Sequence, residues 1–456
     1  MKHIFALILF IAFALCTIAQ QKNNHWISLF DGKSLNGWKK AVGGAEYEAK
    51  DGAIIGTTVP SSPNSFLVTD KEYDDFVLEL EVKIDDTTSN SGVQLRSHLD
   101  AAANNGKGKV YGYQYELDPS SRKWTAGIYD EGRRDWLYPL TLNPAAQTAF
   151  KIHAFNKVKV ECFHHNIRTW INGQPAAYLV DTFDKNGFIG LQVHAVNKPE
   201  DAGKKIFFRN IRIMSIAKPL PDFPKNIYVV NNIPNNLSAY EKQNGWRLLF
   251  DGKTSGGWVG AYKNNFPEKG WIIKDGIITV LSSNGAEATN GGDIVTKEQF
   301  SAYDLSFEFK LTPGANSGVK YFVTLTENNA GSAIGLEYQV LDDKVHPDAK
   351  LGRDGDRTLA SLYDLIPAQK KERFVHPIGE WNTGRIIVYP NNHVEHYLNG
   401  IKVLEYERGS QAYRDLVAIS KYKIWTNFGE AAKGKILLQD HGNEVSFRSI
   451  RIRVLN

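Results

Sequence analysis

The chain has very little cysteine, and its charges nearly cancel. Only two of its 456 residues are cysteines, and one of them, Cys16, lies in an apolar N-terminal segment. Cys162 therefore has no partner for an internal disulfide, and we interpret it as a buried small hydrophobic residue rather than a nucleophile. The formal net charge is only +4, and the basic residues are scattered, which argues against nucleic acid as a partner.

The sequence also lacks the motifs of several common enzyme chemistries. It contains no HExxH, no cysteine-rich zinc pattern, no P-loop, no GxSxG, and no GxGxxG between a strand and a helix. The acidic residues between Asp342 and Lys350, together with Asp354, could ligate a hard cation such as Ca²⁺. The spacing of an EF-hand is absent, however, and a solvated acidic loop is the simpler interpretation.

One long apolar run occurs, at the N-terminus. MKHIFALILFIAFALCTIAQQ has a basic tip, an apolar stretch and small residues around Ala19, which are the features of a secretory signal peptide. We expect cleavage after Ala19 rather than a lipid anchor on Cys16, because the preceding Leu15 is bulky. No other stretch reaches the roughly 18 apolar residues of a membrane span. The sequence thus predicts an exported protein, periplasmic or extracellular, without a membrane-spanning segment.

What the sequence does contain is an internal duplication. LFDGKSLNGW at Leu29 returns as LFDGKTSGGW at Leu248, and SGVQLR, YGYQYELD, RTWING and FRNIRI return in the same order as SGVKYF, IGLEYQVLD, EHYLNG and FRSIRI. A repeat of this length predicts two complete domains, each with its own core. The predicted organisation is a signal peptide at 1–19, a first domain at 24–215, an extended linker at 216–243 and a second domain at 244–456.

The two copies differ in length, because the second carries insertions at 346–358 and 410–433. Insertions collect in loops, so we expect both to be loops on the rim of the second domain. Within each copy, apolar and polar residues alternate, as in DDFVLELEVKI and AYDLSFEFKL, and long helical periodicity is absent. This alternation indicates half-buried strands. The predicted fold is all-β, with two tandem jelly-roll β-sandwich domains.

Alternation also brings polar side chains together, since residues two apart in a strand share a face. In the first copy the candidates are Gln94, Arg96, Gln114, Glu116, Arg168, Trp170, Asn172, Gln192 and His194. In the second copy they are Lys320, Glu337, Gln339, Glu395, Tyr397, Asn399, Gln439 and His441. Such faces are normally only solvated, but these amides, charges and rings suit a polyhydroxylated ligand such as a sugar.

The motifs LFDGKSLNGW, SGVQLR, YQYELDP, GIYDEGRRDWLYPL, LNG and ILLQDHG with FRSIRIR together resemble the family of 3-keto-disaccharide hydrolases, twice over nearly the whole mature chain. The resemblance implies a concanavalin A-like jelly roll and secretion by bacteria that degrade glycans. It also implies cleavage of glycosides already oxidised to a ketone at C3, supplied by a separate oxidoreductase. Such a ketone acidifies the proton on C2, so one base and one enolate stabiliser suffice for β-elimination, after which water can add.

This chemistry suggests roles for the candidates. In the second domain, Glu337 or His441 would be the base, and Lys320 or a bound divalent cation (Ca²⁺ or Mn²⁺) would stabilise the enolate. The first-domain counterparts would be Glu116, His194 and Arg96. The predicted substrate-binding residues are Gln339, Gln439, Tyr397, Asn399, Gln114, Gln192, Trp170, Arg133 and Arg134. Two alternatives remain open, a tandem carbohydrate-binding module without catalysis and an envelope protein without a small ligand.

Overall fold

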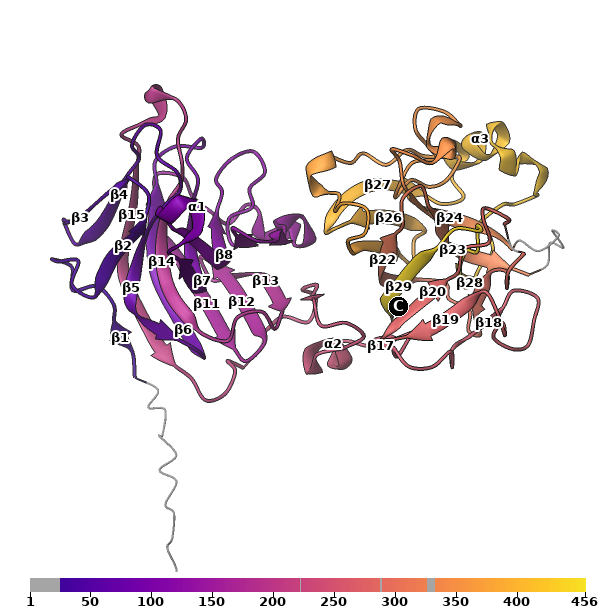
Figure 1. Cartoon of the computed structure of the whole chain (residues 1–456), viewed down its shortest axis with the longest axis horizontal. Helices are drawn as coiled ribbons and strands as arrows, with labels where there is room; N and C mark the ends of the chain where they lie inside the picture. The colour runs from indigo at the N-terminus through magenta and orange to yellow at the C-terminus, as the bar shows by residue number, and fades with distance from the viewer. Residues whose placement is uncertain (1–24, 222, 288, 326–332) are drawn as a thin grey trace, which may run out of the picture.

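The computed structural model describes residues 25–221, 223–287, 289–325 and 333–456, so the predicted signal peptide lies outside the described residues. Two β-rich bodies lie side by side, one from each half of the chain (Figure 1). Each body packs two antiparallel sheets around a hydrophobic core. The predicted all-β class, with two tandem β-sandwich domains, is therefore confirmed. No helix within these residues is long and apolar enough to cross a bilayer.

The first domain packs a nine-stranded sheet against a seven-stranded sheet. The larger sheet has the order β16-β13-β12-β11-β6-β15-β4-β3, with β1 beside β15. Its strands are β1 (Ile27–Ser28), β3 (Glu46–Lys50), β4 (Ala53–Thr57), β6 (Phe76–Ile84), β11 (Asn156–Phe163), β12 (Asn166–Ile171), β13 (Gln174–Val180), β15 (Lys205–Ser215) and β16 (Val230–Asn231).

The smaller sheet has the order β10-β9-β8-β7-β14-β5-β2. Its strands are β2 (Trp38–Val42), β5 (Ser65–Tyr73), β7 (Ser91–Asp100), β8 (Lys109–Leu117), β9 (Ile128–Glu131), β10 (Asp135–Tyr138) and β14 (Gly187–Val193). Short helical turns connect the strands of this domain: α1 (Ala103–Gly106), η1 (Leu140–Leu142), η2 (Pro144–Ala146) and η3 (Pro199–Asp201).

The second domain repeats this plan with an eight-stranded and a five-stranded sheet, in the orders β19-β20-β29-β22-β25-β26-β27, with β17 beside β29, and β18-β21-β28-β23-β24. The larger sheet consists of β17 (Trp246–Leu248), β19 (Trp271–Lys274), β20 (Ile277–Val280), β22 (Tyr303–Leu311), β25 (Asn382–Val388), β26 (His393–Leu398), β27 (Ile401–Glu407) and β29 (Val445–Val454). The smaller consists of β18 (Trp258–Gly260), β21 (Ile294–Thr296), β23 (Asn316–Thr324), β24 (Ile334–Leu341) and β28 (Lys435–Leu438).

The duplicated LFDGK motif forms the same turn in both domains. Asp31 accepts hydrogen bonds from the backbone amides of Lys33 and Ser34 at 2.8 and 2.7 Å, and Asp251 accepts the equivalent pair at 2.7 Å each. The glycine after each aspartate has a positive φ, 80° at Gly32 and 78° at the second copy, which favours glycine because it has no Cβ. Sequence identity in this motif thus reflects turn geometry.

The linker is more structured than an extended connector. Phe223, Ile227 and Val229 pack on Trp170 and Tyr178 in a separate hydrophobic cluster on the outer side of the nine-stranded sheet. Each side chain buried this way stabilises the arrangement by roughly 1.5–3 kcal/mol. The linker also contributes β16, which pairs in parallel with β13. It therefore completes the first domain as well as joining the second.

The short helix α2 (Ala239–Gln243) ends the linker and anchors it to the second domain. Ser238 and Glu241 form a capping box at its start, and the Glu241 carboxylate makes a buried ion pair with Arg451 of β29. Removing one member of a buried pair costs several kcal/mol, because the other charge stays buried. Helix α2 is thus fixed to the second domain.

The two insertions are not simply loops. The segment 410–433 contains α3 (Gln411–Ile419), capped by Ser410, and the 3-10 helix η6 (Lys421–Ile424). The segment 346–358 contains only the 3-10 turn η4 (Pro347–Lys350), and a further turn, η5 (Glu372–Phe374), follows it. The expectation of a loop was wrong for the longer insertion, because the Ser410 side chain accepts a hydrogen bond from the Tyr413 amide and starts a helix.

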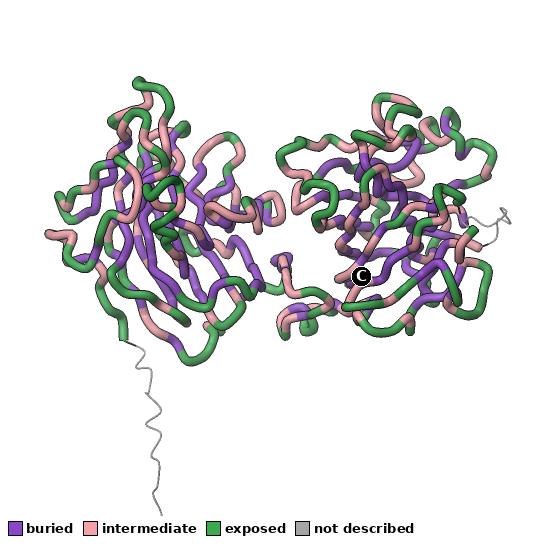
Figure 2. Tube along the Cα trace, viewed as in Figure 1, coloured by how far each residue is buried: buried purple, intermediate pink, exposed green. Residues whose placement is uncertain are grey.

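Burial follows the strands of both domains, as the purple segments of Figure 2 show. Cys162 of β11 is fully buried, and this burial raises the pKa of its thiol to about 12. Such a thiol stays protonated and inert at neutral pH. The prediction of a buried structural cysteine is confirmed.

Candidate functional site

A polar patch lies on the outer face of the five-stranded sheet in the second domain. Lys320 of β23 stands directly opposite Glu337 of β24. Their neighbours along the strands, Val319, Tyr321 and Leu336, belong to the core, so alternation turns Lys320 and Glu337 away from it. Gln339 of β24 and Gln439, next to the end of β28, lie on the same face by the same reasoning. The structure therefore brings these four predicted residues together.

Lys320 and Glu337 are almost fully buried, at 5% and 4% exposure, yet they have few partners. Within the described part of the chain, the Glu337 carboxylate accepts no hydrogen bond, and Lys320 Nζ donates only to the Ala333 carbonyl at 3.3 Å. Buried charges in folded proteins normally have hydrogen-bonding partners, and exceptions concentrate at functional sites. The remaining donor positions on Lys320 and the acceptor positions on Glu337 thus have no partner among the described residues.

Asp293 adds a second carboxyl group beside Lys320. It accepts hydrogen bonds from the backbone amides of Asp440 at 2.9 Å and Ala333 at 3.3 Å. Burial raises the pKa of Asp293 to about 6, against the opposing effect of the Lys320 charge. Burial also disfavours the charge on Lys320, but Glu337 and Asp293 outweigh it and raise the pKa of Lys320. Lys320 is thus held in its cationic form.

Both insertions of the second domain contact Tyr363, which follows the first insertion and is hydrogen-bonded to the backbone of Glu337. Lys421 of η6 places its Nζ 4.1 Å from the centroid of the Tyr363 ring, and the backbone amide of Tyr363 donates to the carbonyl of Glu337 at 3.0 Å. Arg357 of the other insertion lies 5.3 Å from the same ring. Sequence reasoning missed Lys421, Arg357, Tyr363 and Asp293. The signal available was that both insertions occur in only one copy and contain basic residues.

His441 lies at the rim of the patch. Its ring stands perpendicular to that of His346, with centroids 5.9 Å apart, and it is close enough to Asp440 for their charges to interact. Beside it, Gln439 Oε1 is buried and accepts no hydrogen bond from any residue that the structure describes. Gln339 Nε2 donates to the Arg357 carbonyl at 3.4 Å. The rim thus offers further polar groups around the central Lys320 and Glu337.

In the equivalent patch of the first domain, neighbouring side chains donate hydrogen bonds to both oxygens of Glu116. Gln94 donates to Gln114, Gln114 donates to Glu116 at 2.8 Å, and Asn90 donates to the other oxygen of Glu116 at 2.7 Å. Burial raises the pKa of Glu116 to about 7 in spite of these hydrogen bonds. Gln94 occupies the position of Lys320, and the cation whose charge acts on Glu116 is Arg122, which pairs with Asp118 at 2.8 Å.

Gln192 of β14 faces the same outer side of this seven-stranded sheet, because its neighbours Leu191 and Val193 belong to the core. Its Nε2 donates to Glu131 at 3.2 Å, and its buried Oε1 accepts no hydrogen bond from a described residue. Two other first-domain candidates, His194 and Arg96, lie elsewhere. His194 is exposed beyond β14, with Nδ1 2.9 Å from the Ala195 carbonyl oxygen. Arg96 sits at a β-bulge with a φ of 48° and donates to the Asp74 and His164 carbonyls at 2.7 Å each. The bulge interrupts the alternation that predicted a shared face with Gln94.

Three predicted binding residues lie on the opposite sheets. Trp170 is buried under the linker on the nine-stranded sheet, where Arg168 of the same strand is paired with Glu161. Tyr397 lies on the eight-stranded sheet and donates to Glu395 at 2.9 Å. Asn399 shapes the turn after β26 and donates to the Phe374 carbonyl at 2.8 Å. None of them shares a face with Glu116 or Glu337.

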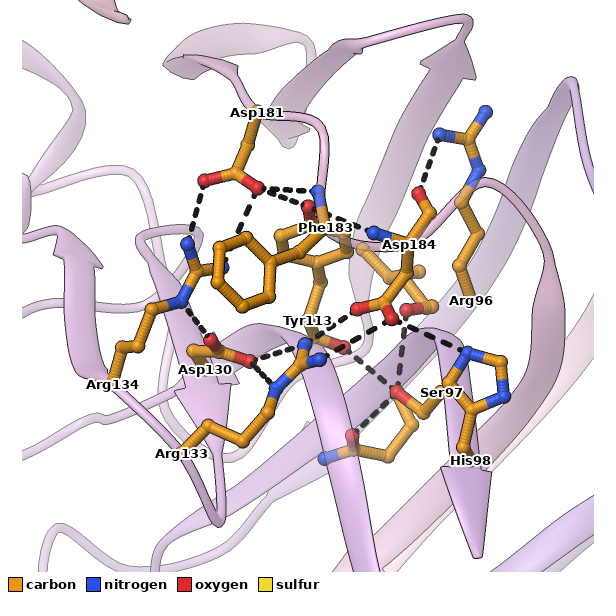
Figure 3. Close-up of polar contacts among 12 residues, drawn as sticks. Arg96, Ser97, His98, Tyr113, Asp130, Arg133, Arg134, Asp181, Phe183 and Asp184 are labelled. Carbon is orange, nitrogen blue, oxygen red and sulfur yellow. Dashed lines mark hydrogen bonds and ion pairs between the residues drawn. The ribbon is translucent and has the colours of Figure 1, made fainter. Parts of the chain in front are cut away.

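Arg133 and Arg134 form a network with three aspartates in the loops beside β9 (Figure 3). Arg133 pairs with Asp130 at 2.7 Å and also with Asp184. Arg134 pairs with Asp130 and, at 2.9 Å, with Asp181. Each guanidinium therefore contacts two carboxylates, which fixes the turn. The network restrains both arginines, and neither pairs with Glu116 among the described residues.

One group of metal-ligand type exists among the described residues, consisting of His393, Glu395 and Glu405. It lies on β26 and β27 of the eight-stranded sheet, and Lys402 already pairs with both glutamates at 3.0 and 2.6 Å. The Lys320 patch contains no comparable group within the described ranges. In that patch the positive charge comes from the Lys320 side chain.

Comparisons with known proteins agree on one family. The model of the 3-keto-alpha-glucoside-1,2-lyase-like domain matches residues 25–214 and 245–453. A 3-keto-disaccharide hydrolase of Bacteroides thetaiotaomicron is 40% identical over 233 residues, covering 46% of this chain and 79% of that protein.

Two solved structures of candidate glycosyl hydrolases from Parabacteroides distasonis are also similar. The first is 29% identical, covers 49% of this chain and 100% of its own, and has a TM-score of 0.43. The second is 27% identical, covers 46% and 99%, and has a TM-score of 0.36.

Proposed function

The chain belongs to the family of the 3-keto-alpha-glucoside-1,2-lyase-like domain, and on this basis we propose that it cleaves glycosides carrying a ketone at C3. The reaction site would be the Lys320 and Glu337 patch of the second domain. The observation that supports this assignment is that, among the described residues, the Glu337 carboxylate accepts no hydrogen bond and Lys320 Nζ donates only to the Ala333 carbonyl, whereas both oxygens of Glu116 in the first domain accept hydrogen bonds. The site needs a ligand that brings both a hydrogen-bond acceptor for Lys320 and an acidic proton for Glu337.

A 3-keto glycoside meets both requirements. The ketone withdraws electrons from C2, so the Glu337 carboxylate can remove the C2 proton as a general base. The electron pair moves to the C3 oxygen, and the Lys320 ammonium stabilises the resulting enolate from a fixed position. When the enolate collapses, a C1–C2 double bond forms and the C1–O bond to the aglycone breaks. Water can then add across the double bond to release the free keto sugar.

Lys320 makes a metal ion unnecessary for this step. Its ammonium faces two carboxylates that keep it charged, and a second cation at the same position would be repelled. We therefore assign the enolate charge to Lys320 rather than to Ca²⁺ or Mn²⁺. His441, Gln439 and Gln339 would contact the hydroxyl groups of the sugar at the rim. The protein would act in the periplasm or outside the cell.

A second function, sugar binding without cleavage, is favoured for the first domain. Its patch combines amide groups with Glu116, whose raised pKa of about 7 lets it both donate and accept hydrogen bonds near neutral pH. The cation near Glu116 is Arg122, which is already paired with Asp118 and so is not free to stabilise an enolate. The first domain would therefore bind hydroxyl groups, exchanging its internal hydrogen bonds for bonds to the sugar, rather than promote elimination.

The direct test compares a 3-keto glucoside carrying a chromogenic aglycone with the unoxidised glucoside, each with and without a chelator. We expect release only from the keto substrate, unaffected by the chelator. Sensitivity to the chelator would overturn the assignment of the enolate charge to Lys320. No release from either substrate, combined with measurable sugar binding by calorimetry, would make the chain a binding module.

A further inference from the structure

The Lys421 ammonium group lies beside the proposed site without a hydrogen bond or ion pair to any described residue. Lys421 begins η6, and its backbone amide is held by Asp364 at 2.7 Å, which fixes the position of its Cα. Its Nζ rests 4.1 Å from the Tyr363 ring centroid. It is close enough to Glu337 and Lys320 for the charges to interact.

The other two polar side chains at this end of the patch, Tyr363 and Arg357, already make hydrogen bonds to aspartates. Tyr363 donates its hydroxyl to Asp348 at 2.8 Å. The Arg357 guanidinium binds Asp348 at 3.0 Å and Asp364 at 2.7 Å. Neither can transfer a proton to a substrate without breaking these contacts. Lys421 is therefore the proton donor that this end of the site leaves available.

The protein shifts the pKa values of the two lysines of the site, Lys320 and Lys421, in opposite directions. Carboxylates keep Lys320 charged, which suits a fixed stabiliser of negative charge. Desolvation lowers the pKa of Lys421, although Glu337 opposes the shift. A lysine that releases its proton more easily is better suited to proton transfer.

We propose that Lys421 is the general acid that protonates the departing aglycone. The proposal rests on the function proposed above. After Glu337 has taken the C2 proton, the enolate re-forms the C3 ketone and the C1–C2 double bond. The electron pair of the C1–O bond leaves with the aglycone oxygen, which takes a proton from the Lys421 ammonium. The products are the unsaturated keto sugar and the alcohol, and water reprotonates the Lys421 amine.

A general acid matters only when the leaving group needs a proton. An alkoxide is a strong base and requires protonation as it departs, whereas a 4-nitrophenolate is stable without it. The test measures kcat/KM of the full chain on a methyl and a 4-nitrophenyl 3-keto-glucoside. Lys421→Met should lose at least about a hundredfold on the methyl glycoside, as is typical of a lost general acid. It should lose less than about fivefold on the nitrophenyl glycoside.

Lys423, two residues along the same 3-10 helix, is the matched control. Both lysines are exposed, but of the two only Lys421 places its ammonium group on the Tyr363 ring beside the site, so Lys423→Met should leave both substrates unaffected. Equal losses on both substrates in Lys421→Met, or no loss on either, would overturn the proposal. Inactivity of the wild-type chain on both keto substrates would instead overturn the proposed function itself. The two failures are therefore distinguishable.

Discussion

Replacing Lys320 by methionine removes the cation opposite Glu337 while keeping most of the side-chain volume. The Lys320 ammonium and an enolate oxygen about 4 Å away would attract each other by about 4 kcal/mol at an effective dielectric constant near 20. This dielectric constant suits a side chain that is only 5% exposed. Because about 1.4 kcal/mol corresponds to a factor of ten in rate, Lys320→Met should lower kcat/KM on a 3-keto glucoside about a thousandfold.

The duplication supplies the matched control for this variant. Gln94 occupies the equivalent position in the first domain, and Gln94→Met removes a neutral group from that patch. It should change kcat/KM by less than about threefold. Thermal unfolding of both variants separates lost chemistry from lost folding. If folded Lys320→Met keeps more than a tenth of the activity, or if Gln94→Met loses as much, the electrostatic role of Lys320 is wrong.

Three further predictions follow from the same geometry. Since the pKa of Glu116 is about 7 in the folded protein against 4.5 for a free side chain, its contribution to the free energy of unfolding is present below pH 4.5 and falls by about 3 kcal/mol as pH rises to about 7. Denaturant unfolding of Glu116→Gln should lack this loss, and an unchanged pH dependence would contradict it. Gly318→Ala would place a methyl group against the Glu337 carboxylate, so cleavage should fall while Gly52→Ala, in an open turn, leaves it intact. His441→Ala should raise KM and leave kcat nearly unchanged, because His441 is assigned to contact the sugar hydroxyl groups; a fall of about a hundredfold in kcat would show that it transfers a proton instead.

The sequence predicted the central pair of the site because that prediction needed only local information. Lys320 and Glu337 each stand in a regular strand, so alternation alone turned them away from the core. Trp170 and Tyr397 show the same alternation, but they belong to the other sheet of each sandwich. A period of two assigns a face within a strand, and it cannot assign the sheet in which that strand lies.

Two other features depended on backbone and long-range geometry. The β-bulge at Arg96 reverses the facing of the residues after it, and the sequence gives no periodic signal for such an interruption. Lys421 lies close enough to Glu337 for their charges to interact, although it is more than eighty positions further along the chain, in a segment expected to be a loop. This proximity depends on the packing of η6 on Tyr363, which the sequence does not show.

The central claim is that cleavage begins with removal of the C2 proton, and running the reaction in D₂O tests it most directly. Elimination followed by addition of water places one deuterium on C2 of the released keto sugar, and an arrested elimination yields the unsaturated ketone. Mass spectrometry of the products, against an enzyme-free exchange control, should therefore find one of these two species. A released sugar that retains its original hydrogen on C2 would contradict the account.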